Sequence, residues 1–451
     1  MKSKDSHYKG RVKFTLKMKK DYTILIPEMA PLHFRLIEPI LSRQGFKIDL
    51  MGAEGPEVLQ KGLKYVHNDI CYPALLITGQ MLTAMESGKY DPQKVAMVIT
   101  QSGGGCRDSN YIHLMRKAFE KAGYPDVPFI SANIWGLELN SGINLSPRTL
   151  LQALAGMIYG DMIMILSNQV RPYEEEKGAT DAMVDHWIER LTEVFGRGRG
   201  FLPGAIEKNL KAIGADFASI PVKRTPKVKV GIVGELFLKY SVPGNNHLEE
   251  FLTEQDCEFF MPSMLGFGVY KTNGALEDLR LYGGKPLKRI IMEIVMKVLF
   301  RVEDLLIRNI EAFDCFTAPE RVNDLKKRAQ GVIGIGNSMG EGWYLAAEML
   351  EMAEHGYENI VCVQPFGCLP CHVSVKGMLN KVRRLDPRVN AVDIEYDPGA
   401  TRVNQENRIK LMLAVARERL SERREPPADL PKVRTSVSAK LTKPKSLCAN
   451  I

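Results

Sequence analysis

Three cysteines occur at the expected ends of strands and helices. Cys106 lies in the segment QSGGGCRDSN, immediately after a predicted strand, and Cys368 lies in PFGCLPCH, immediately after another. Cys71 lies in NDICYPA, at the start of a predicted helix. In open parallel sheets, ligands collect in the crevice beyond the carboxyl ends of the strands. We therefore expect the three thiols to face one region, although they lie far apart in the sequence.

The residues around Cys106 suit a bulky metal cluster. Three consecutive glycines that end at Gly105 let the backbone approach an inorganic core and aim N–H groups at it. Arg107 could offset a cluster's negative charge. Helix starts after Cys71 and Cys106 favour the thiolate form, and thiolates select soft metals: iron–sulfur clusters, zinc or Cu(I).

The other cysteines leave alternatives open. A free cysteine usually packs as a small apolar residue, which is the role that we expect for Cys257 and Cys362. The role of Cys315 is open. Cys371, in a CxxC pair with Cys368, is a candidate metal ligand, but it could equally be a redox partner, half of a zinc site or a tolerated variant. Spacing alone favours metal binding and packing equally, because no compact run of several cysteines is present.

The bulk composition excludes several classes of protein. The N-terminus lacks the apolar stretch of a secretory signal, so we expect a cytoplasmic protein whose eight cysteines are reduced thiols. The apolar run 150–166 is interrupted by two glycines and an aspartate, so we expect no membrane span. The net charge of +8 is concentrated in residues 1–21 and 431–451, so no nucleic-acid groove is expected.

Short apolar runs alternate with amphipathic stretches, which predicts an α/β fold with parallel sheets. The predicted strands are 22–28, 46–52, 95–101, 127–135, 228–235, 257–263, 359–365 and 389–397. The predicted helices are 32–43, 72–87, 109–122, 179–195, 286–312, 373–384 and 404–419. The expected organisation is a basic N-terminal tail (1–21), an α/β domain (22–170), a helical connector (171–226), a second α/β domain (227–420) and a disordered basic tail (421–451).

Long sequence blocks carry a resemblance to a known family. The blocks are KYVHNDICYPALLITGQ, ITQSGGGCRDSNY, IYGDMIMI…VRPYE, KVGIVGELFLKYSVPGNNHLEEFL, QPFGCLPCHVSVKGM and YDPGATRVNQENRIKLML. They resemble the 2-hydroxyacyl-CoA dehydratase-related family. More narrowly, they are similar to the C-terminal region of the large acyl-CoA dehydratase activases and to the double-cubane cluster proteins. The similarity covers most of residues 22–418.

The resemblance implies two flavodoxin-like domains with a 4Fe–4S or double-cubane cluster held by cysteines between them. By position, Cys71, Cys106 and Cys368 match the family's cysteines, whereas Cys371 falls where another residue is expected. The resemblance also implies electrons from an ATP-driven activase partner with an actin-like ATPase fold. No DxGS/T-type phosphate loop precedes Cys71, so the ATP chemistry must come from another chain.

Three further residues are candidate catalytic groups. Glu235 and Lys239 follow the predicted strand 228–235, where substrate contacts and loop-stabilising hydrogen bonds are equally reasonable roles. Glu341 ends the GIGNSMGE turn; it could act as an acid or base, or simply place a favourable charge at a helix start.

The leading hypothesis is an enzyme whose cluster takes a low-potential electron from an ATP-dependent partner and passes it to a small substrate. An acyl-CoA is one candidate substrate, and a homodimer is one candidate assembly. The alternatives are a non-enzymatic electron-transfer or accessory subunit, and a structural zinc protein, which the wide spacing of the cysteines disfavours.

Overall fold

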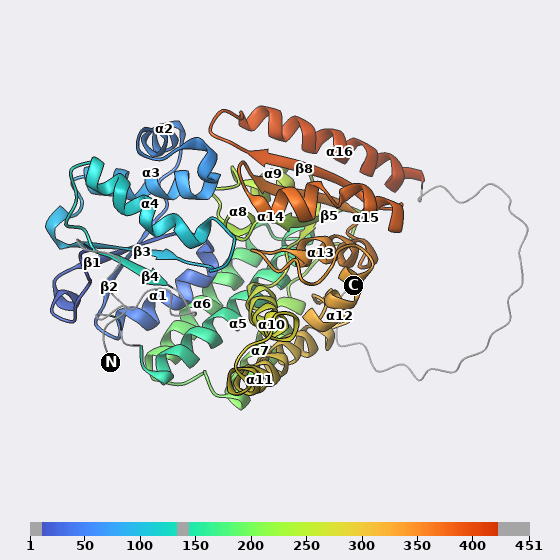
Figure 1. Ribbon diagram of the computed structural model, residues 1–451. Helices are drawn as coiled ribbons and strands as arrows, with labels where there is room; N and C mark the ends of the chain where they lie inside the picture. The colour runs from blue at the N-terminus through green and yellow to red at the C-terminus, as the bar shows by residue number, and fades with distance from the viewer. Residues whose placement is uncertain (1–10, 133–142, 144, 423–451) are drawn as a thin grey trace, which may run out of the picture.

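Two parallel sheets organise the protein (Figure 1). The structure, a computed structural model, describes residues 11–132, 143 and 145–422. The first sheet has the strand order β2-β1-β3-β4, and the second has the order β6-β5-β7-β8. In each sheet the chain moves to one side of its first strand and then crosses to the other, which is the flavodoxin-like doubly wound arrangement. The predicted α/β fold class is therefore confirmed.

The first domain alternates strands with helices. Its strands are β1 (Thr23–Pro27), β2 (Lys47–Met51), β3 (Val95–Thr100) and β4 (Phe129–Ala132). Its helices are α1 (Pro31–Ser42), α2 (Pro56–Tyr65), α3 (Tyr72–Glu86) and α4 (Asp108–Lys121). Right-handed crossovers to opposite sides of β1 require α1 to lie on the face opposite α3 and α4, as Figure 1 shows.

The second domain repeats this topology. Its strands are β5 (Val228–Gly234), β6 (Cys257–Phe260), β7 (Asn359–Pro365) and β8 (Asn390–Tyr396). Its helical segments are α8 (Leu236–Tyr240), α9 (Leu248–Glu254), α13 (Trp343–Glu354), α14 (Leu369–Cys371), a π-helix (His372–Lys376), α15 (Leu379–Leu385) and α16 (Arg402–Glu422). β6 is buried along its whole length and β5 and β7 along nearly all of theirs, which explains their continuous apolar sequences.

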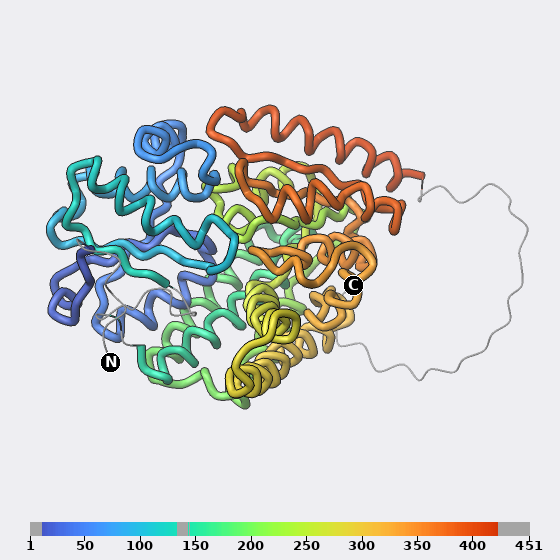
Figure 2. Tube along the Cα trace, viewed as in Figure 1, coloured from blue at the N-terminus to red at the C-terminus, as the bar shows by residue number. Residues whose placement is uncertain are grey.

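A layer of helices lies in the lower part of the view of Figure 2, coloured from green through yellow to orange. It contains α5 (Pro147–Val170), α6 (Ala179–Gly196), α7 (Pro203–Ala218), α10 (Met264–Leu281), α11 (Pro286–Glu311) and α12 (Val322–Gln330). The predicted connector, residues 171–226, is helical, but it forms only part of this layer. Helix α5 precedes the connector, and α10, α11 and α12 are inserted between β6 and β7.

Buried Asp161 of α5 connects this layer to the first domain. Its Oδ1 lies 2.9 Å from His33 Nε2 of α1, and the same atom accepts a 2.8 Å hydrogen bond from the N–H of Met264. Its Oδ2 accepts a 2.8 Å hydrogen bond from the N–H of Leu265. Because a buried carboxylate needs such partners, Asp161 fixes the start of α10 relative to the first domain.

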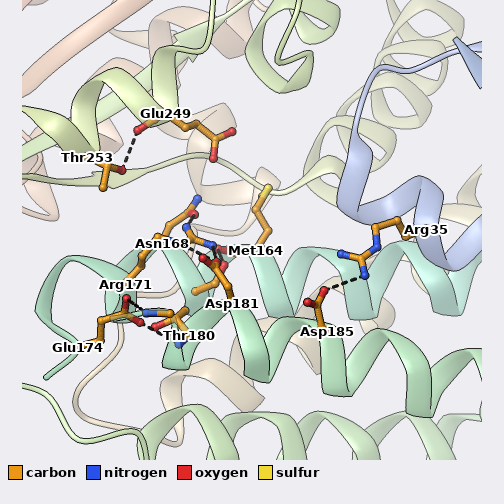
Figure 3. A network of polar contacts seen from close by, with 12 residues as sticks. Arg35, Met164, Asn168, Arg171, Glu174, Thr180, Asp181, Asp185, Glu249 and Thr253 are labelled. Carbon is orange, nitrogen blue, oxygen red and sulfur yellow. Dashed lines mark hydrogen bonds and ion pairs between the residues drawn. The ribbon is translucent and has the colours of Figure 1, made fainter. Parts of the chain in front are cut away.

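Polar contacts also fix α6 against the end of α5 (Figure 3). Arg171 donates to Asp181 at 2.9 and 3.1 Å and to Asn168 at 3.3 Å. Glu174 accepts hydrogen bonds from the N–H groups of Gly178 and Thr180 at the start of α6. These bonds satisfy amides that the first turn of a helix leaves unpaired.

Every predicted strand overlaps an observed one, and the differences concern helices. Several α-helices of the described residues have no counterpart among the predicted helices: α2, α5, α7, α8, α9, α10, α12 and α14. Helices α5 and α10 are buried on most of their faces, and the others are short or interrupted by glycine. The predicted helix 373–384 is a π-helix followed by α15. Part of the predicted strand 127–135 lies outside the described residues, as does almost all of the predicted C-terminal tail and Cys448.

The N-terminal segment differs from the solvated tail that its charge suggested. Phe14 is only 3% exposed and packs with Ile24, Phe46 and Ile130 against the first sheet. Its ring also meets Tyr22 edge to face. One buried aromatic residue therefore holds the described part of this basic segment on the domain.

One described helical segment, Pro147–Tyr173, is long and apolar enough to cross a membrane. The apolar run 150–166 was expected to be too short and too interrupted to do so, but the helical segment that contains it is 27 residues long. However, 72% of its apolar window is buried inside the protein, as in the core helix of a soluble protein.

Replacing Phe14 tests the packing of this segment. The change Phe14→Ala should lower the free energy of unfolding by about 3 kcal/mol, because a buried aromatic ring is lost. Leu16, which is 59% exposed, provides the control, and Leu16→Ala should change stability by less than about 0.5 kcal/mol. Urea denaturation measures both; equal effects would show that residues 11–21 do not dock.

Candidate functional site

Hydrogen bonds beside the cysteines hold three loops together. Arg107, next to Cys106, donates through Nη1 to the carbonyls of Asp69 and Ile70, just before Cys71. Tyr72, just after Cys71, donates its N–H to the carbonyl of Phe366 at 3.1 Å, in the loop that leads to Cys368. The three predicted cysteine loops therefore meet at the carboxyl ends of both sheets, where doubly wound folds bind ligands.

Gly367 allows this close approach. Its φ of +75° lies in the left-handed region that favours glycine. A Cβ atom there would lie 3.2 Å from both Arg107 Nη1 and the Asp69 carbonyl oxygen, and 3.4 Å from Cys71 Cα. Cys71 itself has a φ of 144°, a conformation that is rare without glycine and is often found at functional sites.

The thiols of Cys71, Cys368 and Cys371 lie in hydrogen-bond contact. Cys368 is in the middle, bonded to both of the others, and all three are at most 5% exposed. The hydrogen bond with Cys368, followed by burial, raises the pKa of Cys71, and the bond with Cys371 does most to raise that of Cys368. Tyr111 also hydrogen-bonds to the Cys71 thiol, which partly offsets the rise.

Cys106 lies in the same cavity as Cys71 and Cys368. The cavity has a volume of about 920 Å³ and is lined by residues of both sheet domains. Burial raises the pKa of the Cys106 thiol to about 12, and backbone and side-chain contacts from Asp108 and Ser102 oppose this rise. The structure therefore brings Cys71, Cys106 and Cys368 to one cavity, as predicted. Cys371 contacts Cys368 from behind the cavity wall.

Two of the three candidate catalytic residues line this cavity. Glu235 and Glu341 lie on its wall, where Glu341 accepts a 2.9 Å hydrogen bond from the Leu236 N–H and Glu235 accepts one from the Leu238 N–H. Burial, followed by the charge of Glu341, raises the pKa of Glu235 to about 8. Burial also raises the pKa of Glu341. Glu235 is therefore arranged to hold a proton near neutral pH, and burial disfavours the charged form of Glu341.

The remaining candidates have roles that differ from those expected. Lys239 is not among the residues that line the described cavity; it is buried and pairs with Glu348 at 3.3 Å. Gly105 packs against Met339, since a Cβ atom would lie 2.6 Å from its sulfur. Arg107 lines the cavity, but its guanidinium clamps the Cys71 loop.

Sequence reasoning missed an apolar arm of the cavity. Side chains on one face of the first sheet line it, together with residues of α1 and of the approach to α5: Ile24, Ile26, Ile48, Val98, Ile130, Leu41 and Leu145. The strand residues share a face because neighbours in register point the same way, as Ile24 and Ile48 do. The sequence of these strands has the apolar pattern of an ordinary packed core, so it did not indicate a cavity.

Two polar residues of the cavity were also missed. Lys271 of α10 lines the wall and donates to the Gly340 carbonyl at 3.2 Å, and Tyr111 of α4 reaches Cys71. Tyr111 follows Cys106 by little more than one helical turn, a spacing that could have indicated its position. Lys271 carried no signal, because α10 was not predicted.

The described residues contain no group of three or more His, Cys, Asp and Glu side chains placed to hold one metal ion. The contacting thiols form a row with Cys368 in the middle. Six described cysteines are free, among them the packing residues Cys257 and Cys362. Cys315 is disulfide-bonded, so the expectation of reduced thiols fails there.

No protein-family model matches the chain, and no curated protein shows significant similarity to it.

Substitution of Gly367 tests how the loops meet. Gly367→Ala should separate them and speed alkylation of Cys71 and Cys368 in the native protein, measured by mass spectrometry. Gly104 is the matched control, since its φ of +69° is similar but a Cβ atom there would meet nothing within 4 Å. Both changes carry the strain of a left-handed alanine, about 1 kcal/mol. Equal alkylation rates would contradict the proposed close contact.

The raised pKa of Glu235 predicts a pH dependence of stability. The folded carboxyl loses its proton at about 8 and the unfolded one at 4.5, so the wild-type free energy of unfolding should fall as pH rises through this window. Glu235→Gln removes the titration, and its stability relative to wild type should therefore increase with pH. The free energies of unfolding of wild type and Glu235→Gln are measured by chemical denaturation at several pH values. If the two plots of free energy against pH are parallel, Glu235 titrates normally.

Proposed function

We propose that this protein is an iron–sulfur protein that accepts low-potential electrons from an ATP-dependent activase partner and uses them to reduce or activate a small substrate. The observation that carries the proposal is the convergence of Cys71, Cys106 and Cys368 on one cavity between two flavodoxin-like domains. The sequence blocks that resemble the dehydratase-related family contain all three residues.

The donor set fits a cluster better than a reactive dithiol. A dithiol enzyme needs a lowered thiol pKa, yet the pKa values of Cys71, Cys368 and Cys371 are all raised. Such buried thiols are stable as neutral groups, whereas a bound metal deprotonates its thiol ligands. The thiolates of a cluster bind different irons, so the absence of a single-ion arrangement among the described residues is compatible with this donor set.

Cys71, Cys106 and Cys368 would hold the cluster, and Cys371 would lie against Cys368 as an optional fourth ligand. When bound, a cluster of this kind supplies single electrons at low potential. Tyr111 donates toward the Cys71 sulfur, and Arg107 keeps the Cys71 and Cys106 loops together. These residues position the thiols.

The rest of the cavity would receive the substrate. Its apolar arm suits a hydrocarbon group, and burial raises the pKa of both Glu235 and Glu341, which lie on the cavity wall with the thiols. A substrate that has gained an electron could take a proton from either carboxyl. An acyl-CoA thioester is one substrate that combines an apolar chain with a reducible carbonyl. The ATP-driven partner, a cytoplasmic location and a homodimeric assembly remain parts of the proposal.

Analysis of iron and acid-labile sulfide in anaerobically purified protein tests the proposal. Wild type should contain both, and Cys71→Ser, Cys106→Ser and Cys368→Ser should each lose most of the iron because a thiolate ligand is removed. Cys371→Ser should keep most of it. Cys257→Ser is the matched control, since Cys257 is equally buried but lies in β6, away from the cavity.

Iron without sulfide, or retention of iron in the Cys368 variant, would contradict a cluster at this site. Oxidation of the reduced cluster by a substrate would separate the enzyme from an electron-transfer or accessory subunit, which should show no substrate-dependent oxidation.

A further inference from the structure

A row of carboxyl groups runs through the second domain along α13. Glu354 is at the surface, with a side chain that is 55% exposed. Glu351 and Glu348 follow at 1% and 0% exposure, one and two helical turns inward, and Glu341 lies at the cavity wall just before the helix. The row therefore connects the surface to the cavity that contains the thiols.

Ion pairs and hydrogen bonds hold several members of this row. Lys239 Nζ lies 3.3 Å from Glu348 Oε1, and the positive charge of Lys239 lowers the pKa of Glu341 against the rise from burial. At the outer end, Glu351 accepts a 2.5 Å hydrogen bond from the N–H of Glu320. The Glu320 carboxylate pairs with Arg328, which also pairs with Glu354.

Pairing with Lys239 accounts for only one of the two carboxyl oxygens of Glu348. Burying an ionisable side chain costs several kcal/mol unless its polar atoms are satisfied. Glu351 satisfies a backbone amide, but Glu348 Oε2, in this fully buried residue, has no hydrogen-bond partner among the described residues. A carboxyl oxygen that is buried and unpaired can accept a proton.

We propose that Glu354, Glu351, Glu348, Lys239 and Glu341 form a proton path from solvent to the thiol cavity. The path enters from the surface end of α13, so it would work while substrate fills the cavity. The role of this path rests on the proposed function. For each electron that the ATP-driven partner delivers to a substrate, one proton leaves Glu341 and joins the substrate. Glu341 then regains a proton from the Lys239–Glu348 pair, and that pair from Glu351.

The surroundings of Glu348 suit transfer near neutral pH. Burial raises its pKa to about 7, Lys239 opposes the rise, and the charge of Glu341 adds to it. Burial likewise raises the pKa of Glu351. The other ionisable groups that interact with Glu348 are phenols and a thiol with raised pKa values, which stay neutral: Tyr240, Tyr270, Tyr344 and Cys362.

Infrared spectroscopy after transfer from H₂O to D₂O tests the path without needing a cluster. The measurement is made at about pH 6, below the Glu348 pKa of about 7, so that the Glu348 carboxyl is protonated. The C=O stretching band of this carboxyl is the one that disappears in the Glu348→Gln variant. Glu351→Gln should slow deuteration of this band by about 10²-fold, the scale on which a positioned acid–base group contributes to proton transfer. Glu351→Asp should restore the rate, because it keeps a titratable group.

Two controls decide the direction of transfer. Glu303 is also buried, with a pKa raised to about 7, but it lies on α11 and accepts from the Val322 N–H, so Glu303→Gln should leave the rate unchanged. Glu341→Gln should also leave it unchanged, because protons enter from the other end. The path would be overturned if only Glu341→Gln slowed deuteration of the Glu348 band, or if Glu351→Gln did not slow it. The absence of a band from protonated Glu348 would also overturn it. Iron content is measured separately, so loss of the cluster would refute the proposed function without altering this readout.

Discussion

The cavity depends on a few hydrogen bonds between loops that lie far apart in the sequence. The N–H of Tyr72 donates to the Phe366 carbonyl, and Arg107 donates to the carbonyls of Asp69 and Ile70. Each bond involves a residue next to or near a cysteine, so the backbone holds the thiols together whatever they bind. Gly367 makes this possible, since a side chain there would occupy the space of Arg107 and the Cys71 loop.

The electrostatics of the cavity follow from its burial. Removing thiols and carboxyls from water favours their neutral forms, which is why the pKa values of Cys106, Glu235 and Glu341 are raised. In the proposed reaction, a protonated carboxyl in this cavity would give a proton to a negatively charged intermediate at the place where it forms. The row of carboxyls on α13 would then return that proton from solvent, which joins the site to the surface through a single helix.

The sequence predicted the strands well and with them the loop cysteines, because buried parallel strands have continuous apolar sequences and the ligands follow their carboxyl ends. Local sequence could not predict that the Lys239 side chain lies in the core against Glu348. Its partner belongs to a helix more than 100 residues further along the chain. The apolar arm was likewise hidden, because Ile24 and Val98 have the same pattern in a cavity wall as in a packed core. Phe14 was masked by the basic residues around it.

The central claim is that Cys71, Cys106 and Cys368 bind iron in this cavity. Anomalous diffraction at the iron absorption edge, from crystals of anaerobically purified protein, tests it most directly. The account predicts anomalous density in this cavity between the two sheet domains, with an iron within bonding distance of each of the three sulfurs. A structure from iron-containing protein in which the peak lies elsewhere, or in which Cys106 points away from it, would contradict the account.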